Sequence, residues 1–275
     1  MRFLSLLIGL AVAANLAAAA PIAWAQSDFS SSAAQEAGHF SAAQTAAFSK
    51  QIEEDLADKG ARVAMVFRTG RPRKALPPGI NYTHGAFWVY RDIKIADGKE
   101  LHGYAVYNLF SGDNKTLPKD RSNLAQDFPY EFTQGSAVDD VGVIIPSPEM
   151  QRRILAIIDS PTYEALHNPS YSLIANPLSD QHQNCVSLML DVVAAAAWET
   201  TDRAQIRANL RANFRPTLVR ANLFQRMFGP IADPRLKTDD QSGRLLTATY
   251  ESVRDFMSEN HLLASAYSIT YQSRP

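Results

Sequence analysis

The spacing of apolar residues along the chain predicts a helix that leads into a strand. Residues 41–59 carry Phe48, Ile52 and Leu56 on one helical stripe, and a glycine follows as a stop signal. Residues 62–68 then change to the pattern of a strand. A helix is therefore expected to precede the first strand of a sheet.

Turn residues divide the rest of the chain into shorter elements. Residues 71–79 contain three prolines and are predicted to form a loop. The further predicted elements are two hairpin strands at 82–94 and 100–110, a strand at 142–145, a helix opened by residues 146–149 and running to about 158, a short strand at 171–175, and an apolar helix at 184–198 followed by mainly helical segments. This order predicts an α+β fold with an antiparallel sheet and flanking helices.

The first residues have the pattern of an export signal. Met1-Arg2 is followed by an almost entirely apolar run, and Ala23-Trp24-Ala25 fits the small-x-small pattern of a signal peptidase site. An uncut membrane anchor is the alternative, but Asn15 and Pro21 interrupt the run. We therefore expect a signal peptide at 1–25, a flexible spacer at 26–40, a single domain with a helical C-terminal part at 41–275, and an exported, periplasmic protein.

Composition and charge exclude several classes of function. The chain is 46% hydrophobic and 20% charged, which is enough to bury a substantial core. Its formal net charge of −1 gives no reason to expect a nucleic-acid partner. Because the sequence has no Walker-type loop, dinucleotide glycine pattern or zinc cluster, we expect no cofactor and no metal.

A single cysteine, Cys185, is the most informative residue. In an oxidising compartment a lone thiol is buried and inert, paired with another chain, or kept for its chemistry. Asn184 is a good N-cap, which puts the thiol in the first turn of a helix, where the helix dipole lowers a cysteine pKa. The alternative is a small apolar filler, since free cysteines are often buried.

His84 is the best candidate for a base that activates this thiol. It lies in a predicted strand that is apolar on both faces, where an ionisable ring is costly without a partner. The alternative is a core histidine bonded to the backbone. His182, in the loop before Cys185, is a second candidate base, although a flexible loop would orient it poorly.

The hairpin predicts a third residue beside His84. A bulged turn at Asp97-Gly98 places His84 opposite Phe110 and puts Asn108 diagonal to His84 on the same face. Asn108 is then able to hold the imidazole, as asparagine does in Cys-His-Asn hydrolases. The alternative is an ordinary polar residue at the end of a strand. A two-residue turn would instead bring Tyr107 or Leu109 to that face.

The order of these residues resembles the circularly permuted branch of the NlpC-type papain-like superfamily, which includes the lecithin retinol acyltransferase-like proteins. In that branch a histidine strand precedes an Asn-Cys nucleophile motif, as residues 82–87 precede Asn184-Cys185 here. A broader set of residues resembles the bacterial family called domain of unknown function 2145 (DUF2145). That set comprises residues 60–73, 82–90, 104–109, 144–153, 167–169 and 174–177 together with Asn184-Cys185.

The resemblance implies a papain-like fold and a cysteine hydrolase or acyltransferase that acts on an amide or ester. The acyltransferase-like proteins continue their motif as Asn-Cys-Glu-His, whereas Val186-Ser187 follow here, and their third polar residue is usually histidine rather than Asn108. The substrate class is therefore left open among a small molecule, a cell-wall peptide and a lipid acyl group. Arg71 and Arg73, in the basic loop before the His84 strand, and Asn184 complete the expected substrate-binding residues. The alternative for the two arginines, which their pattern favours, is a solvated basic loop.

The rival expectation is a non-catalytic envelope protein that binds a membrane or a protein partner. Arginines at every fourth position would give a basic helix able to make a peripheral membrane contact. These residues are Arg203, Arg207, Arg211 and Arg215. The apolar residues Ile206, Leu210 and Phe214 lie between them, and we expect this stripe to pack on the domain itself, which leaves the arginines as a solvated rim.

Overall fold

The computed structural model describes residues 39–94, 99–220 and 233–273. The predicted signal peptide, most of the predicted spacer and the tip of the predicted hairpin lie outside these residues. Phe40, near the end of that spacer, packs edge to face against Phe48 and Tyr271. Packing against the domain therefore begins before residue 41.

An antiparallel sheet of six strands forms the middle of the described chain, in the order β4-β3-β2-β1-β5-β8. Its strands are β1 (Val63–Arg68), β2 (His84–Lys94), β3 (Glu100–Ser111), β4 (Ser122–Asp127), β5 (Asp140–Pro146) and β8 (Leu263–Thr270). A separate pair is made by β6 (Thr217–Leu218) and β7 (Leu246–Thr247).

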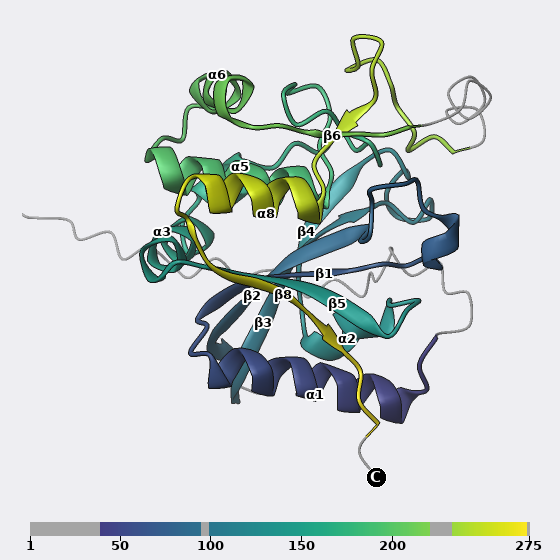
Figure 1. The fold of residues 1–275 in the computed structure, drawn as a ribbon, viewed down its shortest axis with the longest axis vertical. Helices are drawn as coiled ribbons and strands as arrows, with labels where there is room; N and C mark the ends of the chain where they lie inside the picture. Colours follow the sequence, from purple (N-terminus) through teal and green to yellow (C-terminus); the bar gives the residue numbers. More distant parts are fainter. Residues whose placement is uncertain (1–38, 95–98, 221–232, 274–275) are drawn as a thin grey trace, which may run out of the picture.

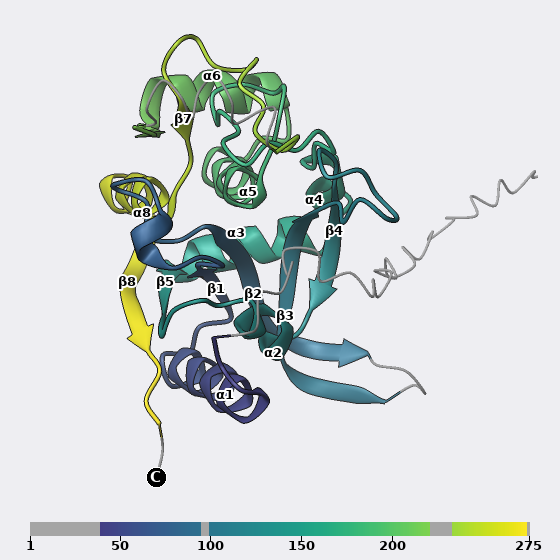
Figure 2. The same cartoon turned by 90° about the vertical axis from the view of Figure 1, so that its right-hand side faces the viewer.

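Helices cover both faces of the sheet (Figures 1 and 2). One face carries α1 (Ala42–Asp58) and α2 (Pro129–Gln134), and the other carries α3 (Pro148–Ile158), α5 (Cys185–Trp198) and α8 (Tyr250–Glu259). α6 (Arg203–Asn213) packs against α5, and α4 (Thr162–Ala165) and a 3₁₀ turn (Arg73–Ala75) are short. The mixed α+β class with an antiparallel sheet is confirmed.

Local sequence signals explain where the helices begin. Ser41 and Gln44 form a capping box at the start of α1, and the stripe Phe48, Ile52 and Leu56 is fully buried. In β1, alternate residues enter two separate core clusters, one under α1 and one under α5, so the whole strand is buried.

The β2–β3 hairpin has the register expected from a bulged turn. Phe87 lies opposite Tyr107 and Lys94 lies opposite Glu100. Extended by three residues, the same register places His84 opposite Phe110. Pairing of β2 with β3 ends at Phe87 and Tyr107, whereas β3 continues to Ser111 along β4. The two strands therefore separate at the end that carries His84.

Several expected elements need correction. β4, α2 and β8 were not predicted, and residues 171–175 form no strand but only a bridge from Tyr171 to Gln183. Four of the six residues of β4 are polar and β8 is rich in Ala and Ser, so neither has a strong apolar alternation. The C-terminal part is also less helical than expected, because it ends in β8, which pairs with β5.

Within the described ranges, no helix has both the length and the apolar character needed to cross a membrane.

Candidate functional site

His84 and Asn108 meet where β2 and β3 separate. The Nε2 atom of His84 lies 3.0 Å from the Oδ1 atom of Asn108, and both residues are buried. The side-chain contact expected from the hairpin register is therefore present. This bond spans the gap between the strands in place of a backbone ladder.

The surroundings of His84 keep its ring neutral. The ring stacks on Phe110 with centroids 5.8 Å apart, and it also contacts Phe132 of α2. Burial lowers the pKa of His84 to about 3, the nearby Arg68 guanidinium lowers it further, and the bond to Asn108 opposes this shift. The alternative of a core histidine bonded to the backbone does not describe this ring, which bonds a side chain.

Cys185 is the first residue of α5, as its sequence predicts. Asn184 caps the helix and forms a capping box with Ser187. The thiol is only 4% exposed, and burial raises its pKa, although the backbone N–H groups of Gly85 and Val186 and the charge of Arg68 act in the opposite direction. The expected low pKa is therefore wrong, because burial outweighs the helix terminus.

The thiol and the imidazole approach the gap from opposite faces of the sheet. His84 lies on the α2 side, where its neighbours along β2 are Ala86 and Trp88, while Cys185 belongs to the core cluster on the α5 side. Among the contacts of the described residues, no hydrogen bond joins the Cys185 sulfur to the His84 ring. The shared neighbour is the Gly85 N–H, which points to the thiol.

Gly85 allows α5 to pack close to β2 at this point. A Cβ atom on Gly85 would lie 2.8 Å from the Phe67 ring and 2.9 Å from the Met189 sulfur. The absence of a side chain at Gly85 thus sets how closely the helix that carries Cys185 sits on the strand that carries His84.

Arg68 places a buried positive charge beside the site. Its Nη1 donates a short hydrogen bond to the carbonyl oxygen of Gly135, and its guanidinium lies 5.3 Å from the centre of the Phe132 ring. Burial lowers the pKa of Arg68 to about 10, while Cys185 and Asp127 raise it. The guanidinium fills the space that a Cβ atom at Gly135 would need.

Asp127 extends the His84–Asn108 pair and was not found from the sequence. Its Oδ2 accepts a 2.8 Å hydrogen bond from the Nδ2 of Asn108. Burial raises the pKa of Asp127 to about 6, Asn108 and Arg68 lower it, and Glu131 raises it. The residue ends β4, and prediction of that strand next to β3 would have been needed to place it here.

The expected substrate-binding residues do not come together. Arg71 is exposed, and its backbone N–H bonds the Thr69 hydroxyl. The Asn184 amide donates to the carbonyl oxygen of Leu173 and to the Thr247 hydroxyl, so Asn184 acts as a cap and a brace.

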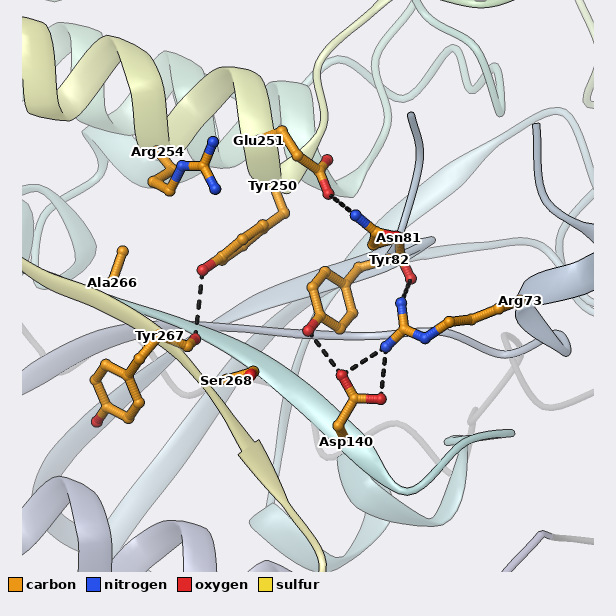
Figure 3. Close-up of a pocket in the computed structure, with 10 residues that line it drawn as sticks. All are labelled: Arg73, Asn81, Tyr82, Asp140, Tyr250, Glu251, Arg254, Ala266, Tyr267 and Ser268. Atoms are coloured by element: carbon orange, nitrogen blue, oxygen red, sulfur yellow. Dashed lines mark hydrogen bonds and ion pairs between the residues drawn. The ribbon is translucent and has the colours of Figure 1, made fainter. Parts of the chain in front are cut away.

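Arg73 instead belongs to a separate open pocket of about 540 Å³ between α8 and the sheet (Figure 3). Its Nη2 donates to both carboxylate oxygens of Asp140 at 2.5 Å, and its guanidinium lies over the Tyr82 ring. Cys185 and His84 are not among the described residues that line this pocket.

His182 is better fixed than expected. Its Nδ1 lies 2.8 Å from the Ser170 hydroxyl and its Nε2 lies 2.7 Å from Asp239, and the residue is buried. The expectation of a poorly oriented ring is therefore wrong, because both ring nitrogens have partners. Neither partner is Cys185, so the ring braces the loop before α5.

The apolar stripe of α6 is buried, as expected. Ile206 and Leu210 are fully buried and Phe214 is 4% exposed. The expectation of a solvated arginine rim fails at Arg207, which is buried and pairs with the buried Asp191 of α5.

A comparison with protein-family models matches residues 55–257 to the family described as uncharacterized protein conserved in bacteria, DUF2145. Searches of the curated proteins and of the solved structures give no match. The match covers most of the chain, including Cys185, His84, Asn108 and Asp127.

Proposed function

Because this chain belongs to the bacterial DUF2145 family, whose description names no activity, we propose a function from the geometry of the site. The protein is an exported cysteine hydrolase or acyltransferase that acts on an amide or ester, with a papain-like arrangement of its catalytic groups. Its substrate is a small molecule, a cell-wall peptide or a lipid acyl group. The observation that carries the proposal is the His84–Asn108 bond at the start of β2, where the next residue, Gly85, directs its backbone N–H to the Cys185 thiol.

The reaction begins from a neutral pair. The raised pKa of Cys185 and the lowered pKa of His84 keep the thiol protonated and the imidazole uncharged at neutral pH. In the proposed reaction, the bound substrate brings the sulfur and the His84 ring together at the gap between β2 and β3; the sulfur attacks the carbonyl carbon, an S–C bond forms, and the thiol proton passes to His84. His84 then gives the proton to the leaving amine or alcohol, and the C–N or C–O bond breaks.

The second half of the reaction releases the acyl group. Water or an acceptor hydroxyl or amine attacks the thioester, gives its proton to His84, and regenerates the thiol. Asn108 orients His84 through both steps, and the backbone N–H of Cys185, at the positive end of α5, stabilises the oxyanion.

The burial of the thiol implies that a substrate must displace the segments that cover it. Asn184 holds the carbonyl of Leu173, and the N–H of Leu173 bonds the carbonyl of Arg235 at 2.8 Å. Residues 171–176 and 233–241 are thereby tied to the residue that precedes Cys185. Tyr171 of this layer interacts with the Cys185 thiol, so we expect opening of the layer to expose the sulfur to an acyl substrate.

A panel of activated acyl esters tests the proposal on the mature protein, with intact mass as the readout. We expect a single acyl adduct that is lost in Cys185→Ala. His84→Gln should slow acylation by roughly 10²-fold or more, because general base catalysis contributes about 10²–10⁴-fold. Asn108→Ala should slow it less, and the matched control His102→Gln, which changes an exposed histidine of β3, should leave it unchanged.

The opposite result would identify another function. Two observations favour a non-catalytic envelope protein: the thiol is buried with a raised pKa, and the thiol and the His84 ring lie on opposite faces of the sheet. If the probes leave Cys185 unmodified between pH 6 and 9 in a folded protein, that second candidate is preferred. If acylation is equally fast in His84→Gln, His84 is not the base.

A further inference from the structure

We propose that Asp127 is a positioning residue that selects the ring tautomer of His84 through the side-chain amide of Asn108. The inference about the tautomer stands on geometry, and its consequence for catalysis rests on the proposed function. Three side chains from three strands form the relay: Asp127 of β4, Asn108 of β3 and His84 of β2.

The first link fixes the amide. An ionised carboxylate only accepts hydrogen bonds, so the Asn108 group that faces Asp127 must be the donor Nδ2, which lies 2.8 Å from Oδ2. The carbonyl Oδ1 of Asn108 then faces the other way, toward His84. Without the carboxylate, the amide could be turned by 180° and still bond the imidazole, because the ring nitrogen serves as donor or acceptor.

The second link fixes the ring. Oδ1 only accepts, so the Nε2 of His84, 3.0 Å away, must carry the proton. His84 is neutral at physiological pH, since burial holds its pKa far below 6.5, and a neutral ring carries one proton. Nδ1 is therefore left with a free lone pair, which is the form that accepts a proton from a thiol.

The relay is reversible because the carboxyl group can take up a proton. Burial brings the pKa of Asp127 to about 6, with Glu131 of α2 raising it and Asn108 of β3 and Arg68 of β1 lowering it. Below that pH the carboxyl group is able to donate through its O–H as well as accept through its C=O, so it no longer holds the amide in one orientation. In the molecules whose amide has turned, the NH₂ group faces the ring and the ring proton lies on Nδ1, where it blocks the base.

Nitrogen-15 NMR of the histidine rings tests this without any substrate. In protein labelled at histidine, the His84 signals are assigned by their loss in His84→Gln. We expect the Nε2–H form at pH 7.5 in the wild type and a mixed population, with the Nδ1–H form raised at least several-fold, in Asp127→Asn. The matched control is Asp92→Asn, which changes an exposed aspartate of β2 that faces His102.

The wild type also tests the relay without substitution. On titration from pH 7.5 to 5, the His84 signals should shift toward the Nδ1–H form with a midpoint near 6. A dominant Nδ1–H form at pH 7.5, or an unchanged tautomer in both Asp127→Asn and the titration, would overturn the inference.

The two proposals fail in different ways. A relay seen by NMR in a protein that no acyl probe labels would support the positioning role and contradict the hydrolase. If Cys185 is acylated but the His84 tautomer is unchanged by Asp127→Asn and by the titration, the positioning role alone is contradicted. When both hold, Asp127→Asn should lower the acylation rate and remove the fall in rate below pH 6.

Discussion

At the scale of single residues, the site consists of polar groups that the surrounding core keeps in their uncharged or bonded forms. The His84 ring contacts the rings of Phe110 and Phe132 and has a polar partner at Nε2. A positive charge on this ring would be surrounded by apolar groups and by the Arg68 guanidinium. Protonation of the resting His84 ring by solvent therefore favours the unfolded state.

We predict that His84 makes the protein less stable as the pH falls. Its pKa is about 3 in the folded state and about 6.5 in the unfolded chain, so the unfolded state binds more protons between these values. The stability that His84 contributes is present above pH 6.5 and is lost toward pH 3, by at most roughly 1.4 kcal/mol per pH unit. Urea unfolding at pH 4, 5, 6 and 7 should show a flatter profile for His84→Gln than for the wild type.

Asp127 supplies an effect of opposite sign in the same experiment. Its pKa is raised, so the folded state holds the proton between about pH 4 and 6, and stability from this group falls as the pH rises through that window. In a protein that keeps His84, Asp127→Asn should therefore make the free energy of unfolding fall more steeply as the pH is lowered. Identical slopes for the wild type and His84→Gln would contradict the buried neutral ring.

His84 and Asn108 could be predicted from the sequence but Asp127 could not, because only the first two lie in one hairpin. The spacing around Asp97-Gly98 sets the register of one hairpin, which is enough to place Asn108 beside His84. Asp127 depends on a strand with weak alternation that pairs outside that hairpin. The raised pKa of Cys185 could not be predicted for a similar reason, since the residues that bury the thiol are distant from it in the sequence.

At the scale of elements, the contact between α5 and β2 decides how the thiol is held. The sequence predicts both elements well, because Asn184 marks the start of α5 and the apolar run marks its length. Their separation depends on Gly85, which has no side chain on the face that meets Met189. Periodicity predicts elements but not such a distance.

Gly85→Ala should destabilise the protein by about 1–3 kcal/mol, because the added methyl group overpacks the space between Phe67 and Met189. The control is Gly103→Ala in β3, where a Cβ atom would lie 3.9 Å from the nearest atom, Glu53 Oε1, and the expected change is within about 0.5 kcal/mol. Urea unfolding measures both. Equal stabilities would show that α5 is free to move away from β2.

At the scale of the whole molecule, α6 is bound to the domain through its apolar stripe and through Arg207. The buried Arg207–Asp191 pair joins α6 to α5, and Arg207 also pairs with Asp180 at 3.0 Å. The amphipathic pattern was visible in the sequence, but the carboxylates that turn one arginine inward were not. The α+β class was likewise predictable, whereas the edge strand β8 closing the sheet after α8 was not.

We predict that the protein does not bind anionic vesicles in a salt-sensitive way, because its apolar stripe is unavailable to lipid. Co-sedimentation with phosphatidylglycerol vesicles at low and high salt measures this. A triple variant with Arg203, Arg211 and Arg215 changed to Gln, which spares the buried Arg207, should behave like the wild type. The prediction is wrong if the protein binds the vesicles, high salt weakens the binding, and the triple variant no longer binds; that result would support a peripheral membrane contact.

The contact between Arg68 and Gly135 links two positions that are far apart in the chain. Gly135 has a φ of −79°, which any residue adopts, so its backbone does not require glycine. The requirement comes from the volume of the Arg68 side chain, which occupies the site of a Cβ atom there. The side chains at the two positions therefore compete for the same space. A residue larger than glycine at 135 requires a side chain shorter than arginine at 68, and that change removes the positive charge beside the thiol. Substitutions at these two sites are thus expected to be inherited as pairs.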